Sequence, residues 1–377
     1  MRALLIASIA CGACASRVNP EYCANHPSDH AYCPYEDGGA TADAPPLCIG
    51  SNKLALCVDA PQASVMLPAM LDSDGSPLCL QAQPAMWKAN GQPDACIITG
   101  TTISATSTTV TGGRPLVLVA SDSISVSQLL DASSHYGAGS TGPGADPASC
   151  VTGLSPGSGG GGGGGGAGGT FFGAVGGDGG RGNGSEAGGT AGMAVTMPMV
   201  LGGGCPGQVG GSSGGAGGVG GYGGGAMFLA AVDQIDLSGA TVAASGAGGA
   251  GAALNVNGGG GGGGGSGGMI VLYAGSSIAT TNTLLSANGG GGGGGGDQFA
   301  AGSPGSDPDP SMPLTAAGGG TGGAAGGSGF ALNSNAQMGD VGNGGGYGGG
   351  GGGGGGGYIL ANHMIGATMV SPMPTTM

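Results

Sequence analysis

The sequence predicts a mostly β protein, a repetitive parallel β-helix-like solenoid with glycine-rich tracts that follows a small disulfide-rich head. Three observations lead to this prediction: 100 of the 377 residues are glycine, β-branched and apolar segments alternate with polyglycine, and these segments align with one another. Alternating apolar and polar residues are typical of half-buried strands. We therefore divide the chain into a signal peptide (1–13), a cysteine-rich head (14–94) and a glycine-rich repetitive β domain (95–377).

Composition alone is also typical of a disordered or fibrous chain, because Gly (100) and Pro (22) together make up about a third of the residues. Disordered chains, however, usually combine low hydrophobicity with many charges. Here 39% of the residues are hydrophobic and 7% are charged. The composition therefore fits a glycine-rich ordered scaffold at least as well.

The N-terminus, "MRALLIASIACGAC", has the form of a secretory signal: one basic residue, an apolar stretch over residues 3–10, and small residues before a cysteine. The stretch is too short to span a bilayer. Gly and Ala before Cys14 resemble a bacterial lipobox, so Cys14 is the expected lipidation site and Cys11 the alternative. We expect an exported protein anchored through lipid at the outer membrane or cell surface. The alternative is a secreted protein cleaved near Ala15.

Ten cysteines support export, because removing the signal and a lipidated Cys14 leaves eight. An even number in an exported chain indicates disulfides. The sequence leaves the connectivity open, and the simplest arrangement pairs neighbours: Cys23 with Cys33, Cys48 with Cys57, Cys79 with Cys96, and Cys150 with Cys205. No C-x-x-C pair remains after the signal, so a zinc site is not expected.

The β-like segments of the chain share one pattern: an apolar strand, a polar turn, an aliphatic residue, and a closing Ala-Ser or Ala-Asn that is degraded in the last copy. The segments cover residues 114–134, 226–246, 269–289 and 358–372. Equivalent positions hold Ile124, Ile235, Ile278 and Ile365, separated by 111, 43 and 87 residues. Such repetition indicates a stacked unit. Because the period varies, we expect the strands to form a fixed layer and the glycine tracts to project from one side of it. A parallel β-helix is the expected form of this layer, and a sandwich-like stack is the alternative.

Four polyglycine tracts interrupt this layer: Gly159–Gly166, Gly258–Gly265, Gly289–Gly296 and Gly348–Gly357. Ordering a glycine costs about 1–2 kcal/mol of backbone entropy, so a folded tract must recover much free energy. Polyproline II strands packed side by side are one solution, because backbones without Cβ atoms approach closely. Flexible loops are the alternative. The similar lengths of the tracts favour order.

The whole layout resembles a group of uncharacterised glycine-rich exported proteins of myxobacteria and related soil bacteria. The resemblance is carried by "RVNPEYC" in the head, "RPLVLVASDSISV", "LGGGCPG" around Cys205, and "SANGGGGGGGG". It covers nearly the whole chain. It implies an exported protein but no activity, and no functional residue is carried over from it.

The charge balance excludes nucleic acid as a partner. The net charge is −14, and the six basic residues are scattered along the chain. Nucleic-acid binding needs clustered cations that displace counterions from phosphates.

Catalytic groups are sparse as well. A polysaccharide-degrading β-helix enzyme needs convergent acids and bases, but after residue 113 the cations are Arg114 and Arg181, and the histidines are scattered. Glycine runs match G-x-G-x-x-G by necessity, without the strand-to-helix context of a nucleotide site. We expect no enzyme and no cofactor.

Calcium is the one metal with candidate ligands, since acids in glycine-rich turns bind it. Asp72 and Asp74 in "LDSDGSP" and Asp178 in "GGDGGRGNGS" are weak candidates, and solvated turns are the expected alternative.

The sequence therefore predicts a non-enzymatic cell-envelope or surface lipoprotein with a structural, adhesive or matrix-binding role, whose partners are the membrane, through the lipid anchor, and polysaccharide or envelope components. A carbohydrate-active β-helix enzyme is one alternative. A ligand-binding or ice-binding glycine-rich module is another, although the irregular spacing of Thr102, Thr109 and Thr111 is better explained by β propensity.

Overall fold

In the computed structural model, residues Pro46–Met377 form a compact unit. The structure describes residues 46–138, 141–158, 175–183, 186–193, 200–212, 215–254, 257–343, 347–363, 365–366 and 368–377. The expected signal peptide, the lipidation candidates Cys14 and Cys11, and the Cys23–Cys33 pair lie outside the described residues.

A two-stranded antiparallel sheet opens the described chain. It consists of β1 (Leu47–Ile49) and β2 (Leu56–Val58), linked through the 3-10 turn η1 (Asn52–Leu54). The Cys48–Cys57 disulfide joins residues that lie directly opposite each other on the two strands.

Helix α2 (Ala85–Ala89) carries the single tryptophan of the chain into the core. Trp87 is fully buried, and its indole N–H donates to the Pro93 carbonyl at 2.7 Å. Its ring stacks on Phe228 of the main sheet, with centroids 6.5 Å apart. Residues 46–94 therefore pack against the main sheet through this contact.

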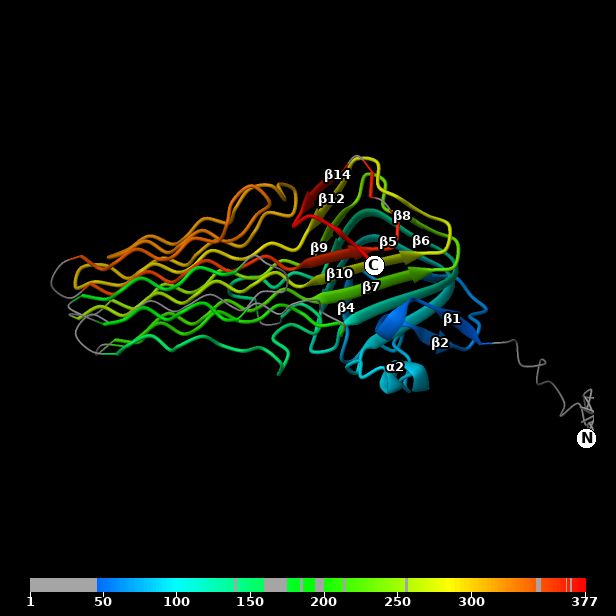
Figure 1. The fold of residues 1–377 in the computed structure, drawn as a ribbon, viewed down its shortest axis with the longest axis horizontal. Coiled ribbons are helices and arrows are strands. Elements are labelled where there is room, and N and C mark those ends of the chain that lie inside the picture. Colours follow the sequence, from blue (N-terminus) through cyan, green and yellow to red (C-terminus); the bar gives the residue numbers. More distant parts are fainter. Residues whose placement is uncertain are drawn as a thin grey trace, which may run out of the picture. The chain divides into compact units, whose positions relative to one another are not determined.

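Thirteen strands of the described chain form the main sheet, and all their pairings are parallel. They are β3 (Val65–Met66), β4 (Met70–Asp72), β5 (Cys96–Thr111), β6 (Leu116–Asp131), β7 (Ala226–Ala231), β8 (Gln234–Asp236), β9 (Thr241–Ala243), β10 (Met269–Ala274), β11 (Ser277–Ala279), β12 (Thr283–Ser286), β13 (Tyr358–Ala361), β14 (Thr368–Ser371) and β15 (Thr375–Thr376). The sheet is curled (Figure 1). The prediction of a mostly β protein is confirmed.

Strand β6 shows how the apolar pattern sets burial. Leu116 and Leu118 face the larger apolar cluster, while Val117 and Val119 face a second cluster on the other side of the sheet. This apolar run is thus buried on both faces, as parallel strands usually are. Further along, buried Ile124 begins an alternation with exposed serines, the pattern of a half-buried strand.

The aligned segments of the sequence stack in register. Ile124 pairs with Ile235, and Ile235 pairs with Ile278. Ile365 packs against the same apolar cluster but lies outside the strands. The alignment therefore located neighbouring rungs of the sheet correctly for three segments. The last segment also pairs in register through β13 and β14, and at Ile365 it keeps the apolar contact without a strand.

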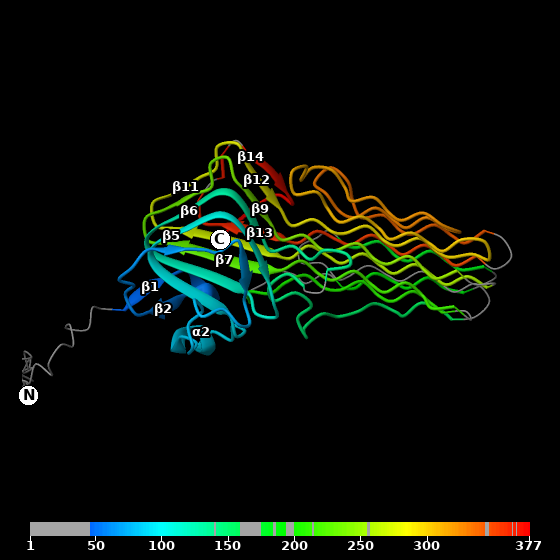
Figure 2. The same ribbon diagram turned by 180° about the vertical axis from the view of Figure 1, so that it is seen from behind.

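Between sets of strands the chain leaves the sheet and returns in long extended segments, visible in both views (Figures 1 and 2). Gly218, Gly221 and Gly224 donate to the carbonyls of Gly260, Gly263 and Ser266. A hydrogen bond at every third residue matches the three-residue turn of polyproline II, which leaves its backbone groups free for neighbours. Three of the four polyglycine tracts are thus packed, hydrogen-bonded segments; Gly159–Gly166 lies outside the described residues.

Close approach of backbones explains why these tracts are glycine. A Cβ on Gly291, Gly292 or Gly293 would meet a carbonyl oxygen of three different neighbours, Gly318, Gly351 and Ala250 respectively, closer than the 3.0 Å that real Cβ atoms keep. A positive φ angle does not explain why these tracts are glycine, because Gly258 is the one residue of the three described tracts with a positive φ.

The number of neighbours determines how much glycine a segment needs. The tract Gly289–Gly296 exchanges backbone hydrogen bonds with six segments: 244–253, 258–268, 302–306, 318–323, 324–330 and 347–357. Segment 215–225 instead carries a side chain at every third position, and its Val219 and Tyr222 are 60% and 43% exposed. Unbroken polyglycine therefore marks an interior segment, and Gly-Gly-X marks an outer one.

A buried polar ladder lies where the strands end and the glycine segments begin. Ser133 Oγ accepts the N–H of Ser245, and Ser245 Oγ accepts the N–H of Asn288, at 2.9 and 3.2 Å. The Asn288 amide donates to the Pro313 carbonyl and accepts from Ser371 Oγ. Because buried polar groups need partners, these contacts explain the Ala-Ser or Ala-Asn that closes each aligned segment.

Two further disulfides, Cys79–Cys96 and Cys150–Cys205, complete the described set. Together with Cys48–Cys57 they are three of the four neighbour pairs expected from the sequence. The Cys150–Cys205 bond ties the segment that follows β6 to the segment that leads toward β7.

We expect Gly293→Ala to lower the free energy of unfolding by about 2–4 kcal/mol, because the added methyl group meets backbone that has no room to move. Gly318→Ala is the matched control, since its Cβ would find only Ser306 Oγ, at 3.9 Å. That variant should change stability by less than about 0.5 kcal/mol. Denaturant unfolding of the oxidised chain measures both, and equal effects would contradict the close-packing argument.

Candidate functional site

The predicted calcium ligands are engaged in backbone contacts. Asp72 Oδ1 accepts the N–H of Asp74, and Asp74 Oδ2 accepts the N–H of Gly113 at 2.6 Å. Arg114 Nε lies 3.7 Å from the Asp74 carboxylate. Asp178 belongs to the bundle segment 175–183, where it accepts the N–H of Ala191. The structure does not bring the three together, and among the described residues no three acidic, histidine or cysteine side chains cluster as a metal site.

The threonines considered for a flat hydroxyl face lie on β5. Thr102 Oγ1 donates to Ser64 Oγ at 2.8 Å, and Thr109 pairs with Met70 of β4. Ser64 therefore occupies the Thr102 hydroxyl, and β4 pairs with the backbone of β5 at Thr109.

His135, Asp131 and Asp307 form a charged cluster, here called the clamp. It holds the loop that carries Asp307 at the junction where the strands end and the glycine segments begin. His135 Nε2 lies 3.1 Å from Asp131 Oδ2, and His135 Nδ1 lies 3.6 Å from Asp307 Oδ2. Asp307 also accepts the backbone N–H groups of Tyr136 and Gly248. The sequence did not indicate this cluster, because Asp307 lies far along the chain from His135.

The carboxylates of Asp131 and Asp307 determine the protonation state of His135. Hydrogen bonds to Asp131 and Asp307 raise the pKa of His135 to about 10, against the opposing effect of burial. Burial raises the pKa of Asp307, but the contacts with His135, Gly248 and Tyr136 outweigh it and leave that pKa below its ordinary value. At neutral pH, His135 is therefore an imidazolium between two carboxylates and a structural tie rather than a base.

We expect His135→Gln to be less stable than the wild type at pH 7, with a difference that disappears above about pH 10. A histidine whose folded-state pKa is raised from 6.5 to about 10 contributes stability in full below pH 6.5 and loses it as the pH rises through 10. Melting temperatures from pH 6 to 11 measure the difference. His363→Gln is the control, because His363 contacts the Ala274 carbonyl and not an acid. A difference that stays constant over this range would rule out the clamp.

Asp146 is a strained, half-buried acid at the same junction. Its φ is +54°, a conformation that Asn adopts more readily than most residues. Its Oδ1 accepts the N–H of Gly223 at 2.7 Å. Burial raises its pKa to about 6, although the Gly223 hydrogen bond opposes the shift.

We expect Asp146→Asn to raise the melting temperature at pH 7.5 by a few degrees. Asn keeps an acceptor for Gly223 and removes a carboxylate whose folded-state pKa of about 6 exceeds its ordinary 3.8. The wild type therefore loses stability as the pH rises from about 3.8 to 6, and the variant does not. Thermal melts at pH 3.5 and pH 7.5 should show the gain at the higher pH alone, and an equal gain at both would contradict the assignment.

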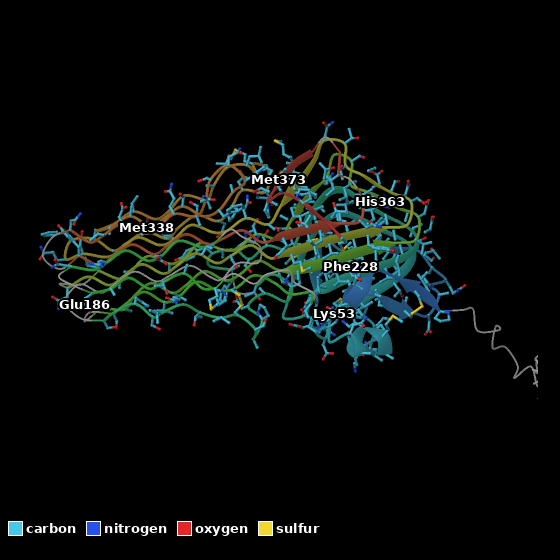
Figure 3. The ribbon with its side chains drawn as sticks, viewed as in Figure 1. Lys53, Glu186, Phe228, Met338, His363 and Met373 are labelled. Carbon is cyan, nitrogen blue, oxygen red and sulfur yellow. A yellow bond between two sulfur atoms is a disulfide. The ribbon has the colours of Figure 1, made fainter. Side chains whose placement is uncertain are left out.

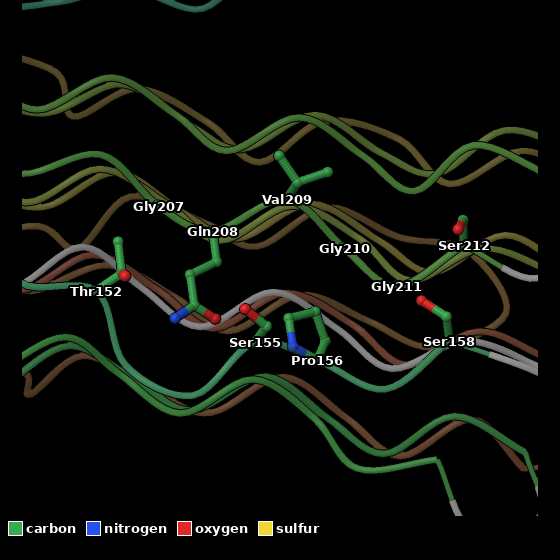
Figure 4. A pocket seen from close by; sticks show the side chains of 10 residues that line it. All are labelled: Thr152, Ser155, Pro156, Ser158, Gly207, Gln208, Val209, Gly210, Gly211 and Ser212. Carbon is green, nitrogen blue, oxygen red and sulfur yellow. The ribbon is translucent and has the colours of Figure 1, made fainter.

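A groove of about 450 Å³ runs along the flank of the bundle between residues 152–158 and 207–212 (Figure 4). Its lining residues are Thr152, Ser155, Pro156, Ser158, Gly207, Gln208, Val209, Gly210, Gly211 and Ser212. These residues include hydroxyls and one amide but no charged side chain. Such a lining can exchange hydrogen bonds with a neutral, hydroxyl-bearing ligand.

The backbone period positions the polar groups of this groove. Thr152, Ser155 and Ser158 are three residues apart on one extended segment, so their hydroxyls recur on one face. Gln208 points from the opposite segment toward Ser155, and Ser212 lies opposite Ser158 (Figure 4). The three-residue spacing in "TGLSPGS" is the signal that could have identified this site, but recognising it requires knowing the conformation of the segment.

In the part of the chain that the structure describes, no helix has the length and apolarity needed to cross a bilayer. Comparison with known proteins found no matching family model, no similar curated protein and no similar solved structure.

Proposed function

We propose that the protein is a non-enzymatic, exported scaffold of the cell envelope or surface, lipid-anchored through Cys14, with a structural, adhesive or matrix-binding role. The observation that carries this proposal is the glycine bundle, whose segments are cross-linked by hydrogen bonds at every third residue. A body held together in this way resists bending and keeps whatever it displays at a constant distance from its attachment. A secreted scaffold without the lipid is the alternative.

The surface of the bundle can present side chains to a binding partner. Its interior is backbone, so the side chains gather on the outside, as Figure 3 shows with Met338, which is 64% exposed. We propose that the curled sheet serves as the base, a parallel β-helix-like stack in which each set of strands sends out one glycine excursion. The three disulfides fit an oxidising extracellular environment.

A ligand-binding module is the second candidate, and the uncharged groove on the flank favours it. A carbohydrate-active enzyme is less well supported, because the described residues that line the groove include no acid and hydrolysis of a glycosidic bond uses paired carboxylates.

We expect the oxidised, purified chain to co-sediment with insoluble extracellular matrix prepared from cells that produce it. The Gly293→Ala variant, which loosens the bundle interior, should co-sediment less, because display depends on a rigid bundle. Gly318→Ala is the matched control and should behave as the wild type. If the wild type stays in the supernatant with matrix and envelope material alike, the adhesive role is excluded.

A further inference from the structure

One wall of the groove carries polar side chains at a regular spacing. The N–H of Gly157 donates to Ala187, and the N–H of Thr190 donates to Leu154, so the wall carrying Ser155 is held at the three-residue period. Polyproline II rises about 3.1 Å per residue, which places successive hydroxyls of Thr152, Ser155 and Ser158 about 9 Å apart. A regular row of this kind matches a ligand that repeats along its length better than a single small molecule.

The two walls are also held to each other. The Cys150–Cys205 disulfide joins them just before Thr152 on one wall and Gln208 on the other. The disulfide therefore fixes the separation of the two walls at one end of the groove before a ligand arrives. A preformed site loses less conformational entropy on binding.

The chemistry of the lining selects the ligand class. Hydroxyl and amide groups both donate and accept, as a sugar hydroxyl requires. Pro156 and Val209 add apolar surface suited to the C–H groups of a sugar ring. The protein carries a net charge of −14, which repels acidic polymers at long range, and the described lining residues include no cation that would offset this repulsion.

We propose that this groove binds a strand of uncharged polysaccharide through the exposed hydroxyls of Thr152, Ser155 and Ser158, which contact sugar units about 9 Å apart along the strand. The inference rests on the proposed matrix-binding role and names the chemistry that serves it.

The test measures binding of the full mature, oxidised chain to soluble polymers at 0.15 M salt, by affinity electrophoresis and calorimetry. The neutral probes are a β-glucan, a mannan and dextran, and the acidic probes are alginate and polygalacturonate. We expect binding to at least one neutral polymer and none to the acidic ones. Ser155→Ala should weaken that binding about fivefold, the effect of losing one neutral hydrogen bond, and the double variant Ser155→Ala/Ser158→Ala should weaken it further.

Ser306→Ala is the matched control, because Ser306 is exposed on segment 302–306, which does not line the groove. It should bind as the wild type, and all variants should melt at the wild-type temperature. Binding to acidic polymers alone, binding to none of the polymers, or binding to neutral polymer with unchanged affinity in Ser155→Ala/Ser158→Ala overturns the proposal. If that double variant still co-sediments with the matrix at full strength, the groove assignment fails and the adhesive role stands. If the wild type binds neither matrix nor polymer, both fail.

Discussion

The rest of this structure depends on backbone-to-backbone contact that only glycine allows. In the interior tract Gly289–Gly296, consecutive residues face different neighbours, and each approach is too close for a Cβ atom. The hydrogen bonds at every third residue offset the entropy that glycine loses on ordering. A core of this kind contains almost no side chains, so its specificity comes from the lengths and register of the segments and not from the shapes of apolar groups.

The sheet supplies that register. Parallel pairing places Ile124, Ile235 and Ile278 on successive rungs, and therefore starts each glycine excursion at an equivalent level. Where the two-residue period of a strand changes to the three-residue period of the bundle, hydrogen bonding must also change. The buried ladder through Ser245 and Asn288 and the clamp around His135 lie at this transition, where they satisfy polar groups that neither regular structure satisfies.

Because the interior of the bundle consists of backbone, it also determines where side chains can contact a ligand. Side chains that could recognise a ligand are confined to outer segments and recur there every third residue. The groove between Ser155 and Gln208 follows from this geometry, since two outer segments with small polar residues lie side by side and are joined by a disulfide. Function in such a protein lies on the surface of a rigid body whose inside is chemically uniform.

By itself, the sequence determined the β-rich class and the alignment of the repeated strands. It left the disulfide connectivity open, and its simplest arrangement, neighbour pairing, is confirmed for the three described disulfides. The β-rich class and the alignment can be read along the chain, because alternation and internal similarity are properties of the sequence itself. The tertiary structure decided what lies between distant segments: the curled sheet, the packing of residues 46–94 through Trp87 and Phe228, the His135–Asp307 clamp and the groove. Polyglycine carries no side-chain pattern, so the neighbours of each tract are fixed only when the sheet aligns the excursions and the missing Cβ atoms let them meet.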